Sequence, residues 1–514
     1  MFFRKKLIAS AMILAMSTSL LTGYSKSINN STNSTNATEM AYNGLFKEDE
    51  VMDIKIEISE DDWNDMKENA IDEEYYSANI TIGDTKIENI GIRTKGFSSL
   101  QSVASSDSDR YSFRVKFDKY VDGQNLNGLN ELVLNNNFQD PSYMREYLSY
   151  KALEELGVDV PETSYANIYV NGELFGFYLA VEAVDDSFVE RIADSDSTDV
   201  KLYKADGENS TLVDEASLSG FELKSGEDDS MAGLKKLVSA INSIEDGNKD
   251  DIESVFDVDT FLKSIAVNTV VGNYDSYNGS KAHNYFLLEE DGVFKYIPWD
   301  FNMSFGGFSE DNGASVTVSI DEPLYNVDSS KRPLIEKLLS VDEYKEKYYG
   351  YLKELVNYFD DFETQVNDLA TLIKPYVEND PTAFYTIEQF EENIVASDTD
   401  LSTVKNNMNG NKPDNGDNGE NPGTPPDNTN GEPPAIPNGE NPGTPPDNAN
   451  GEAPAMPDGE NPGTPPDNAN GEAPTMPDGM EMPNKGGGMN LSGDVVSIMD
   501  YLQQRIENIK TQLS

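Results

Sequence analysis

The sequence contains no cysteine and only one histidine, His283. The absence of cysteine excludes disulfides, thiolate zinc sites and a cysteine nucleophile. A single histidine excludes a metal centre built from several histidines and disfavours a Ser-His-Asp hydrolase. Any catalysis by this chain must therefore use other side chains.

Positive charge is also scarce, with 38 Lys and Arg residues against 93 Asp and Glu residues and a net charge of −55. This balance argues against nucleic-acid binding, because phosphate recognition needs clustered cations. Outside residues 411–488 the net charge is still −43, so the expected folded part carries most of it. An acidic surface attracts basic polypeptides, which predicts a Lys/Arg-rich protein partner. The alternative is that acidity only keeps the protein soluble.

The N-terminus has the pattern of a secretory signal. Residues 4–6 are basic, and the apolar run 7–21 is too short for a comfortable membrane span. Tyr24 stands where a lipoprotein would carry its lipidated cysteine, so lipid anchoring is not expected. We predict a signal peptide over 1–24 and a flexible tether over 25–44, with an uncleaved anchor as the alternative. The location expected is the exterior or spore coat of a Gram-positive-type bacterium.

A proline-rich segment interrupts the second half of the chain. Residues 411–488 hold 18 of the 25 prolines and no aromatic residue, and a 20-residue unit repeats at 419–438, 439–458 and 459–478. This composition cannot bury enough apolar surface to offset chain entropy, so we predict a disordered insert over 411–489. The apolar spacing after it predicts a helix within 490–514 that docks on the preceding domain.

The remaining sequence predicts an α+β fold with a strand-rich N-terminal lobe over 45–185 and a mainly helical C-terminal lobe over 186–410. A helix over 141–156 is expected to begin near Asp140 and Pro141 and to end at Gly157. Alternating patterns and turn residues predict strands and hairpins at 51–59, 76–82, 85–93, 111–117, 165–170, 175–181 and 284–299.

Several polar residues between these elements are candidates for nucleotide binding. The turn at 93–99 could cover phosphates through Lys95, Gly96 and Ser98, although an ordinary hairpin is the better explanation of this turn taken alone. The other candidates are Lys116 on a strand and Glu146 on the 141–156 helix, each of which has a plain surface alternative, and Glu182 on a possible connector between lobes.

Three further residues suggest a catalytic and metal site. Asp275 lies in a dense polar loop after an apolar helical stretch and could act as a base. Asn284 and Asp300 flank the 284–299 hairpin, whose outer ends must meet, and their oxygens suit a divalent cation. Singly, each signal is weak. Their order along the chain, however, follows the parts of a protein kinase.

The chain resembles the CotH kinase family, the spore-coat protein H family of atypical secreted kinases. The most specific stretch is IPWDFNMSFGG at 297–307. Further stretches that carry the resemblance lie at 91–99, 111–117, 140–157, 168–188, 202–204, 272–277, 283–286 and 332–339. The resemblance implies a two-lobed kinase-like fold and transfer of the ATP γ-phosphate to Ser or Thr of spore-coat or surface proteins, with Mg²⁺ or Mn²⁺.

The resemblance also implies residue roles. Asp275 would be the catalytic Asp, Asp300 and Asn284 the metal ligands, and Lys116 with Glu146 the ion pair that positions the nucleotide. Asn284 follows Asp275 by nine positions, against five in ordinary kinases, and no Gly follows Phe301. The alternatives are an inactive kinase-like protein with a structural or binding role in the coat, and an enzyme that transfers AMP. The sequence leaves the oligomeric state open.

Overall fold

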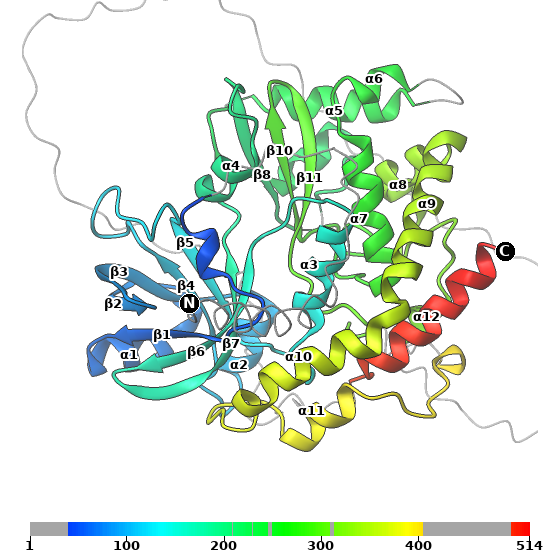
Figure 1. The fold of residues 1–514 in the computed structure, drawn as a ribbon. Helices are drawn as coiled ribbons and strands as arrows, with labels where there is room; N and C mark the ends of the chain where they lie inside the picture. Colours follow the sequence, from blue (N-terminus) through cyan, green and yellow to red (C-terminus); the bar gives the residue numbers. More distant parts are fainter. Residues whose placement is uncertain (1–39, 208, 229, 245–248, 309–312, 405–494) are drawn as a thin grey trace, which may run out of the picture. The chain divides into compact units, whose positions relative to one another are not determined.

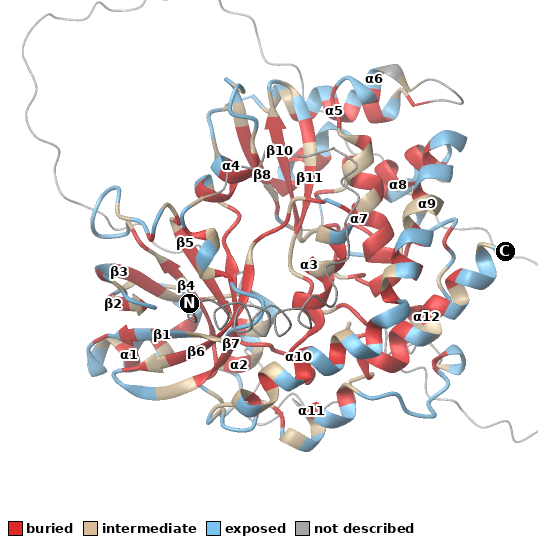
Figure 2. Cartoon of the chain, viewed as in Figure 1, coloured by how far each residue is buried: buried red, intermediate tan, exposed pale blue. Residues whose placement is uncertain are grey.

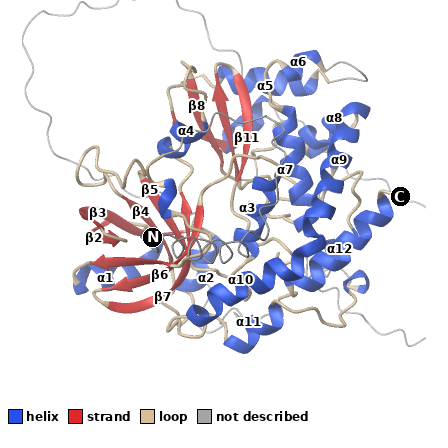
Figure 3. Ribbon diagram, in the orientation of Figure 1, coloured by secondary structure: helices blue, strands red, loops and turns tan. Residues whose placement is uncertain are grey.

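The computed structural model describes residues 40–404 and 495–514, apart from 208, 229, 245–248 and 309–312 (Figure 1). These residues form both helices and strands, so the fold is α+β, as expected (Figure 3). The predicted signal peptide, most of the tether and the proline-rich insert lie outside the described residues. Among those described, no helix is long and apolar enough to cross a bilayer. The division into two lobes stays a prediction.

The strands are β1 (Met52–Glu57), β2 (Tyr76–Ile82), β3 (Thr85–Lys95), β4 (Ser112–Lys116), β5 (Glu131–Asn135), β6 (Thr163–Val170), β7 (Glu173–Glu182), β8 (Val200–Ala205), β9 (Phe221–Ser225), β10 (Tyr285–Glu290) and β11 (Val293–Pro298). The α-helices are α1 (Glu60–Glu68), α2 (Ser98–Ala104), α3 (Arg145–Glu155), α4 (Asp186–Ile192), α5 (Ala232–Asn242), α6 (Asp250–Glu253), α7 (Val258–Val271), α8 (Pro333–Leu339), α9 (Asp342–Tyr358), α10 (Phe362–Val377), α11 (Ile387–Asn393) and α12 (Ile498–Gln512).

Seven strands close into a barrel in the order β1-β2-β3-β4-β5-β7-β6. The pairs are antiparallel except for β1 with β6, which run parallel and complete the ring. Every second side chain along a strand points into the barrel, and apolar side chains at these positions fill its interior. Ile54 and Ile56 of β1, for example, are buried beside Ile80 of β2. The side chains inside the barrel form one cluster of buried residues, which includes Tyr42 ahead of β1 and Ala180 of β7. Closure removes the free sheet edges, and it fixes where β3, β4 and β5 end.

A second sheet has the order β11-β10-β8-β9 and packs with the helices around a separate core. At its centre is α7, in which eleven of fourteen residues are buried (Figure 2). The three residues of α7 that are not buried, Asp259, Thr260 and Lys263, lie near its start, so the rest of the helix is in the protein interior. Gly272 ends α7 at φ +64°, which directs the chain into the loop that carries Asp275.

The C-terminal helix α12 completes this core. The Arg505 side chain donates to the carbonyl oxygens of Thr269 on α7 at 2.9 Å and Val316 at 3.0 Å. The Tyr501 hydroxyl lies 2.8 Å from the Ser315 hydroxyl, and a Cβ atom at Gly272 would overlap the Tyr501 ring. The helix expected within 490–514 is thus present and packs against the end of α7.

The helix expected over 141–156 begins four residues late, at Arg145. Pro141 lies outside it, which corrects the expected start. Asp140 still accepts the Arg145 backbone N–H at 3.0 Å, so it satisfies a free donor of the first turn from further away. The expected apolar stripe is buried, including Leu148 and Ala152. As a result α3 is held firmly between neighbours, and its first turn carries Glu146.

Candidate functional site

Lys95 is the last residue of β3 and lies beside the first turn of α3. Its Nζ donates to Asn135 Oδ1 at 3.1 Å, and the Asn135 amide donates in turn to Glu146 Oε2 at 2.7 Å. Asn135 is the last residue of β5, so two strand ends and one helix meet here. An asparagine therefore bridges a lysine and a buried glutamate.

Lys116 does not occupy this position, which corrects the Lys116–Glu146 pair expected from the sequence. It forms ion pairs with Glu131 at 2.9 Å and Asp118 at 3.2 Å. The register pairs Lys116 with Gly91, whereas Lys95 pairs with Ser112. The two lysines are thus on one face of the sheet but about 13 Å apart along β3. The lysine coupled to Glu146 is Lys95.

Asp275 is held by the two residues that precede β10. His283 Nε2 lies 2.7 Å from Asp275 Oδ1, and the Asn284 amide donates to Asp275 O at 2.8 Å and to Oδ2 at 3.2 Å. Both oxygens of the Asp275 side chain therefore have a partner. This arrangement fixes the direction of a half-buried carboxylate after the end of α7.

Asn284 and Asp300 stand at the open end of the β10–β11 hairpin. The Trp299 N–H donates to the Asn284 carbonyl at 3.1 Å, so the outer ends of the hairpin meet as expected. Asn284 has φ +58° and Asp300 has φ +60°. Non-glycine residues rarely adopt this left-handed conformation, and such residues concentrate at functional sites. Asn and Asp tolerate it best.

Asp300 is at the electrostatic centre of the site. Burial raises the pKa of Asp300, and the Asp275 carboxylate adds to that shift, whereas Lys95, His283 and Lys204 oppose it. Burial also raises the pKa of Glu146 to about 8, and the charge of Asp300 adds to that shift. Burial lowers the pKa of Lys95 despite both acids. Residues 275 and 300, although far apart in sequence, thus interact within one site.

These residues fit a hard divalent cation. Among the described residues no group of three His, Cys, Asp or Glu side chains forms a metal site. Mg²⁺ needs fewer protein ligands, because it commonly binds one or two carboxylates, water and substrate phosphates. Asp300 and Asn284 offer such oxygens.

The turn after Lys95 leads into a helix rather than the ordinary hairpin. Gly96 has φ +120°, and a Cβ there would lie 2.8 Å from Ser99 Oγ. Ser98 begins the seven-residue helix α2. Nucleotide contacts from Lys95, Gly96 and Ser98 stay a prediction.

Glu182 does not present its carboxylate to the site. It is fully buried, and both oxygens accept hydrogen bonds, from the Tyr42 hydroxyl at 2.6 Å and the Glu162 N–H at 2.9 Å. The Arg191 guanidinium also binds it at 2.5 Å. The expected nucleotide contact through this side chain is therefore replaced by a buried structural ion pair.

Sequence reasoning missed three residues of the site. Asn135 is a polar residue that directly follows the apolar run 132–134 at the end of β5, and that break in pattern was the available signal. Tyr150 accepts the Asp300 N–H at 3.2 Å from one turn beyond Glu146. Lys204 lies on β8 and acts on Asp300 through its charge. No local sequence signal reveals that β8 lies near β11.

Comparisons of the sequence with known proteins agree on one family. A family profile described as CotH kinase protein matches residues 92–407. The inner spore coat protein H of Bacillus subtilis (strain 168) is 27% identical over 297 residues, covering 55% of this chain and 78% of that protein. Spore coat protein homolog 1 of Rhizopus delemar is 24% identical over 247 residues, covering 45% of this chain but only 39% of that protein.

Among solved structures, a chain from the Shewanella oneidensis MR-1 toxin–antitoxin complex of HipA, HipB and operator DNA is 11% identical. The match covers 56% of this chain and 61% of that one. Its TM-score of 0.19 is too low to indicate a common fold. The profile match, in contrast, spans more than half of the sequence and includes Lys95, Glu146, Asp275 and Asp300. The chain belongs to the CotH kinase protein family.

Proposed function

We propose that the chain is an atypical protein kinase with a two-lobed kinase-like fold, which transfers the γ-phosphate of ATP to Ser or Thr of a spore-coat or surface protein. The main support is the convergence of Asp275, Asp300, Lys95 and Glu146 from four separate segments. Phosphoryl transfer needs positioning and neutralisation of charge more than covalent chemistry, and these groups supply both.

In the proposed reaction the acceptor hydroxyl attacks the γ-phosphorus, and its oxygen forms the new P–O bond. The bond between the γ-phosphorus and the β–γ bridging oxygen breaks, so ADP leaves. Asp275 orients the hydroxyl and takes its proton, while His283 and Asn284 hold the Asp275 carboxylate in place. Lys95 binds phosphate oxygens, and Asn135 and Glu146 set the direction of its ammonium group.

A divalent cation would be held by Asp300 and Asn284. Its chemistry there would be to neutralise phosphate oxygens that the carboxylates otherwise repel. The spore-coat names of the relatives and the acidic sequence favour a basic coat or surface protein as acceptor.

The test is incubation of the full chain with γ-labelled ATP, Mg²⁺ or Mn²⁺ and a basic Ser-containing protein such as histone H1, with acidic casein as the matched acceptor. Label should enter the basic acceptor, and EDTA, Asp275→Asn or Asp300→Asn should remove it. These isosteric variants keep the side-chain volume, and circular dichroism verifies their fold. An acceptor that gains the mass of AMP would replace the proposal with AMP transfer. Equal labelling with and without EDTA would reject the mechanism, and an acceptor that stays unlabelled would favour a binding role.

A further inference from the structure

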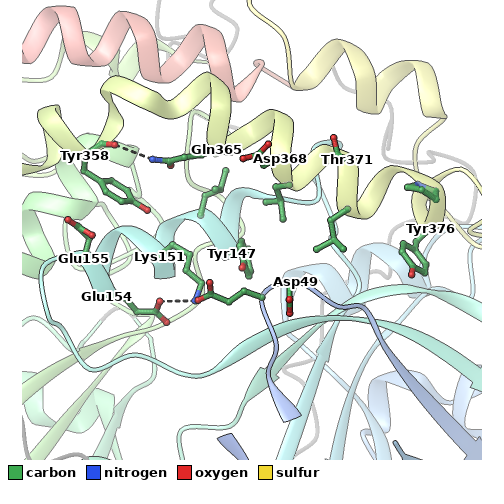
Figure 4. Close-up of a pocket in the computed structure, with 15 residues that line it drawn as sticks. Asp49, Tyr147, Lys151, Glu154, Glu155, Tyr358, Gln365, Asp368, Thr371 and Tyr376 are labelled. Carbon is green, nitrogen blue, oxygen red and sulfur yellow. Dashed lines mark hydrogen bonds and ion pairs between the residues drawn. The ribbon is translucent and has the colours of Figure 1, made fainter. Parts of the chain in front are cut away.

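A cavity of about 960 Å³ lies apart from the candidate site, between α3, α10 and the segment that precedes β1. Figure 4 shows side chains of α3 facing those of α10 across it. We call it the α3–α10 groove. Its volume is in the range of sites that enclose several ligand side chains or a drug-sized molecule.

The groove is strongly acidic. Five carboxylates and a single ammonium group line it. That ammonium, on Lys151, is already paired with Glu48 and Glu154, both at 2.8 Å. The lining carboxylates that form no ion pair within the described residues are Asp49, Glu155 and Asp368. The groove therefore has negative charge that the protein does not compensate.

Its floor is apolar. Leu148 comes from α3, and Leu369, Leu372 and Pro375 come from α10. An apolar floor with an acidic rim is the surface pattern of a protein interaction site, in which the floor supplies burial and the rim supplies selectivity. A hydrated cation alone would need no such floor.

Tyr147 adds an aromatic wall to the groove. Its side chain lines the groove, and the residue is only 7% exposed. The Lys151 ammonium lies over its ring, 5.4 Å from the ring centroid. An aromatic ring beside an apolar floor gives an apolar side chain of a partner more surface to pack against.

We propose that the α3–α10 groove binds a short segment of a partner protein that carries Lys or Arg on both sides of one or two apolar side chains. Charge complementarity selects this occupant. The chain's own segment 411–488, with 14 acidic residues and two lysines, carries the wrong charge. The proposal concerns binding alone and does not depend on phosphoryl transfer.

The first test measures binding of a short fluorescent synthetic peptide, with lysines on both sides of a Leu-Phe pair, to the full chain by fluorescence anisotropy. Peptides with Glu in place of Lys, or Ser in place of Leu-Phe, are expected to bind at least about tenfold more weakly. Asp275→Asn should bind the peptide like the wild type. Equal affinity for the three peptides would overturn the proposal.

A matched pair of protein variants then locates the site. Asp368→Lys and Asp84→Lys change the net charge equally, and both residues are exposed, Asp84 lying in the turn between β2 and β3. Asp368→Lys should weaken peptide binding about tenfold, whereas Asp84→Lys should change it less than about twofold. Equal weakening by both would show unspecific attraction to an acidic protein and would also overturn the proposal.

A second localisation does not depend on charge. Because the chain has no cysteine, an environment-sensitive dye can be attached to one introduced residue. Thr371→Cys places it on the groove wall, and Ser239→Cys places it at an exposed position on α5, which contributes no residue to the groove. Peptide addition should change the emission at 371 and leave 239 unaffected. A response only at 239 would contradict the proposed site.

Discussion

The Arg145 Nε donates to the backbone carbonyl of Ser304 at 3.0 Å, and thereby ties the first turn of α3 to the segment that follows Asp300. The Arg145 side chain is fully buried and also pairs with Asp140 at 2.7 Å. Glu146, the next residue, faces the candidate site. One guanidinium group thus links Asp140, just before the helix that carries Glu146, to the segment that follows Asp300.

Arg145→Ala should therefore lower the free energy of unfolding by about 3–5 kcal/mol, because it leaves the buried Asp140 carboxylate unpaired. Lys86→Ala, which breaks the exposed Lys86–Glu57 pair, is the control and should cost about 0–1 kcal/mol. Urea denaturation followed by circular dichroism measures both. Similar losses for the two variants would show that the Arg145 network is not central to stability.

Lys95→Ala and Lys116→Ala distinguish the roles of the two lysines, which share one face of the barrel sheet. If Lys95 binds nucleotide phosphates, its loss should reduce phosphoryl transfer about 10²–10³-fold, the range for a preorganised charged group. Lys116 pairs with Glu131 and Asp118 instead, so Lys116→Ala should retain activity within about threefold. Initial rates with γ-labelled ATP decide between them. The reverse ranking would restore Lys116 as the nucleotide lysine.

His283→Ala removes one of the two groups that hold the Asp275 carboxylate. As a positioning residue, His283 should affect kcat by up to about 10²-fold and leave the KM for ATP nearly unchanged. His283→Gln, which keeps a hydrogen-bonding nitrogen near the same place, should recover part of the loss. A rise in KM with normal kcat would instead indicate that His283 contacts the nucleotide.

Asp185 predicts a pH dependence of stability. Burial raises the pKa of Asp185 to about 7, well above its ordinary value of 3.8, and its Oδ2 is buried with no hydrogen-bond partner among the described groups. The folded protein holds a proton that the unfolded chain releases, so the free energy of unfolding should fall as pH rises from about 4 to about 7. Asp185→Asn cannot ionise and should gain stability relative to wild type across this window.

Thermal unfolding of both proteins at pH 4.5 and pH 8 measures this difference, in which other titrating groups cancel. A difference that does not change with pH would mean that Asp185 is solvated in the folded state.

The local pattern of the sequence predicts many helices and strands but not how the strands pair with one another. The strands over 76–82 and 284–299, and the stripe that includes Leu148, follow from alternation and helical spacing. Closure of the barrel through parallel β1 and β6 does not, because it depends on residues more than a hundred positions apart. The short strand β5 was missed because its apolar run has no alternation.

The site shows the same limit. The meeting of Asn284 and Asp300 followed from hairpin geometry alone, since a two-residue turn fixes which ends are opposite. The identity of the lysine near Glu146 did not, because Lys95 and Lys116 share a face and only the β3–β4 register separates them. Alternation gives the side of a sheet, and long-range pairing gives the position along it.

The place of α12 bears on how the protein is made. Tyr501 and Arg505 cover the end of α7, yet a ribosome adds them only after residues 405–494. During synthesis the apolar surface that α12 covers therefore stays exposed until that segment has been translated. A premature stop anywhere within the proline-rich repeats would release a chain with this surface bare, a product prone to aggregate or to be degraded.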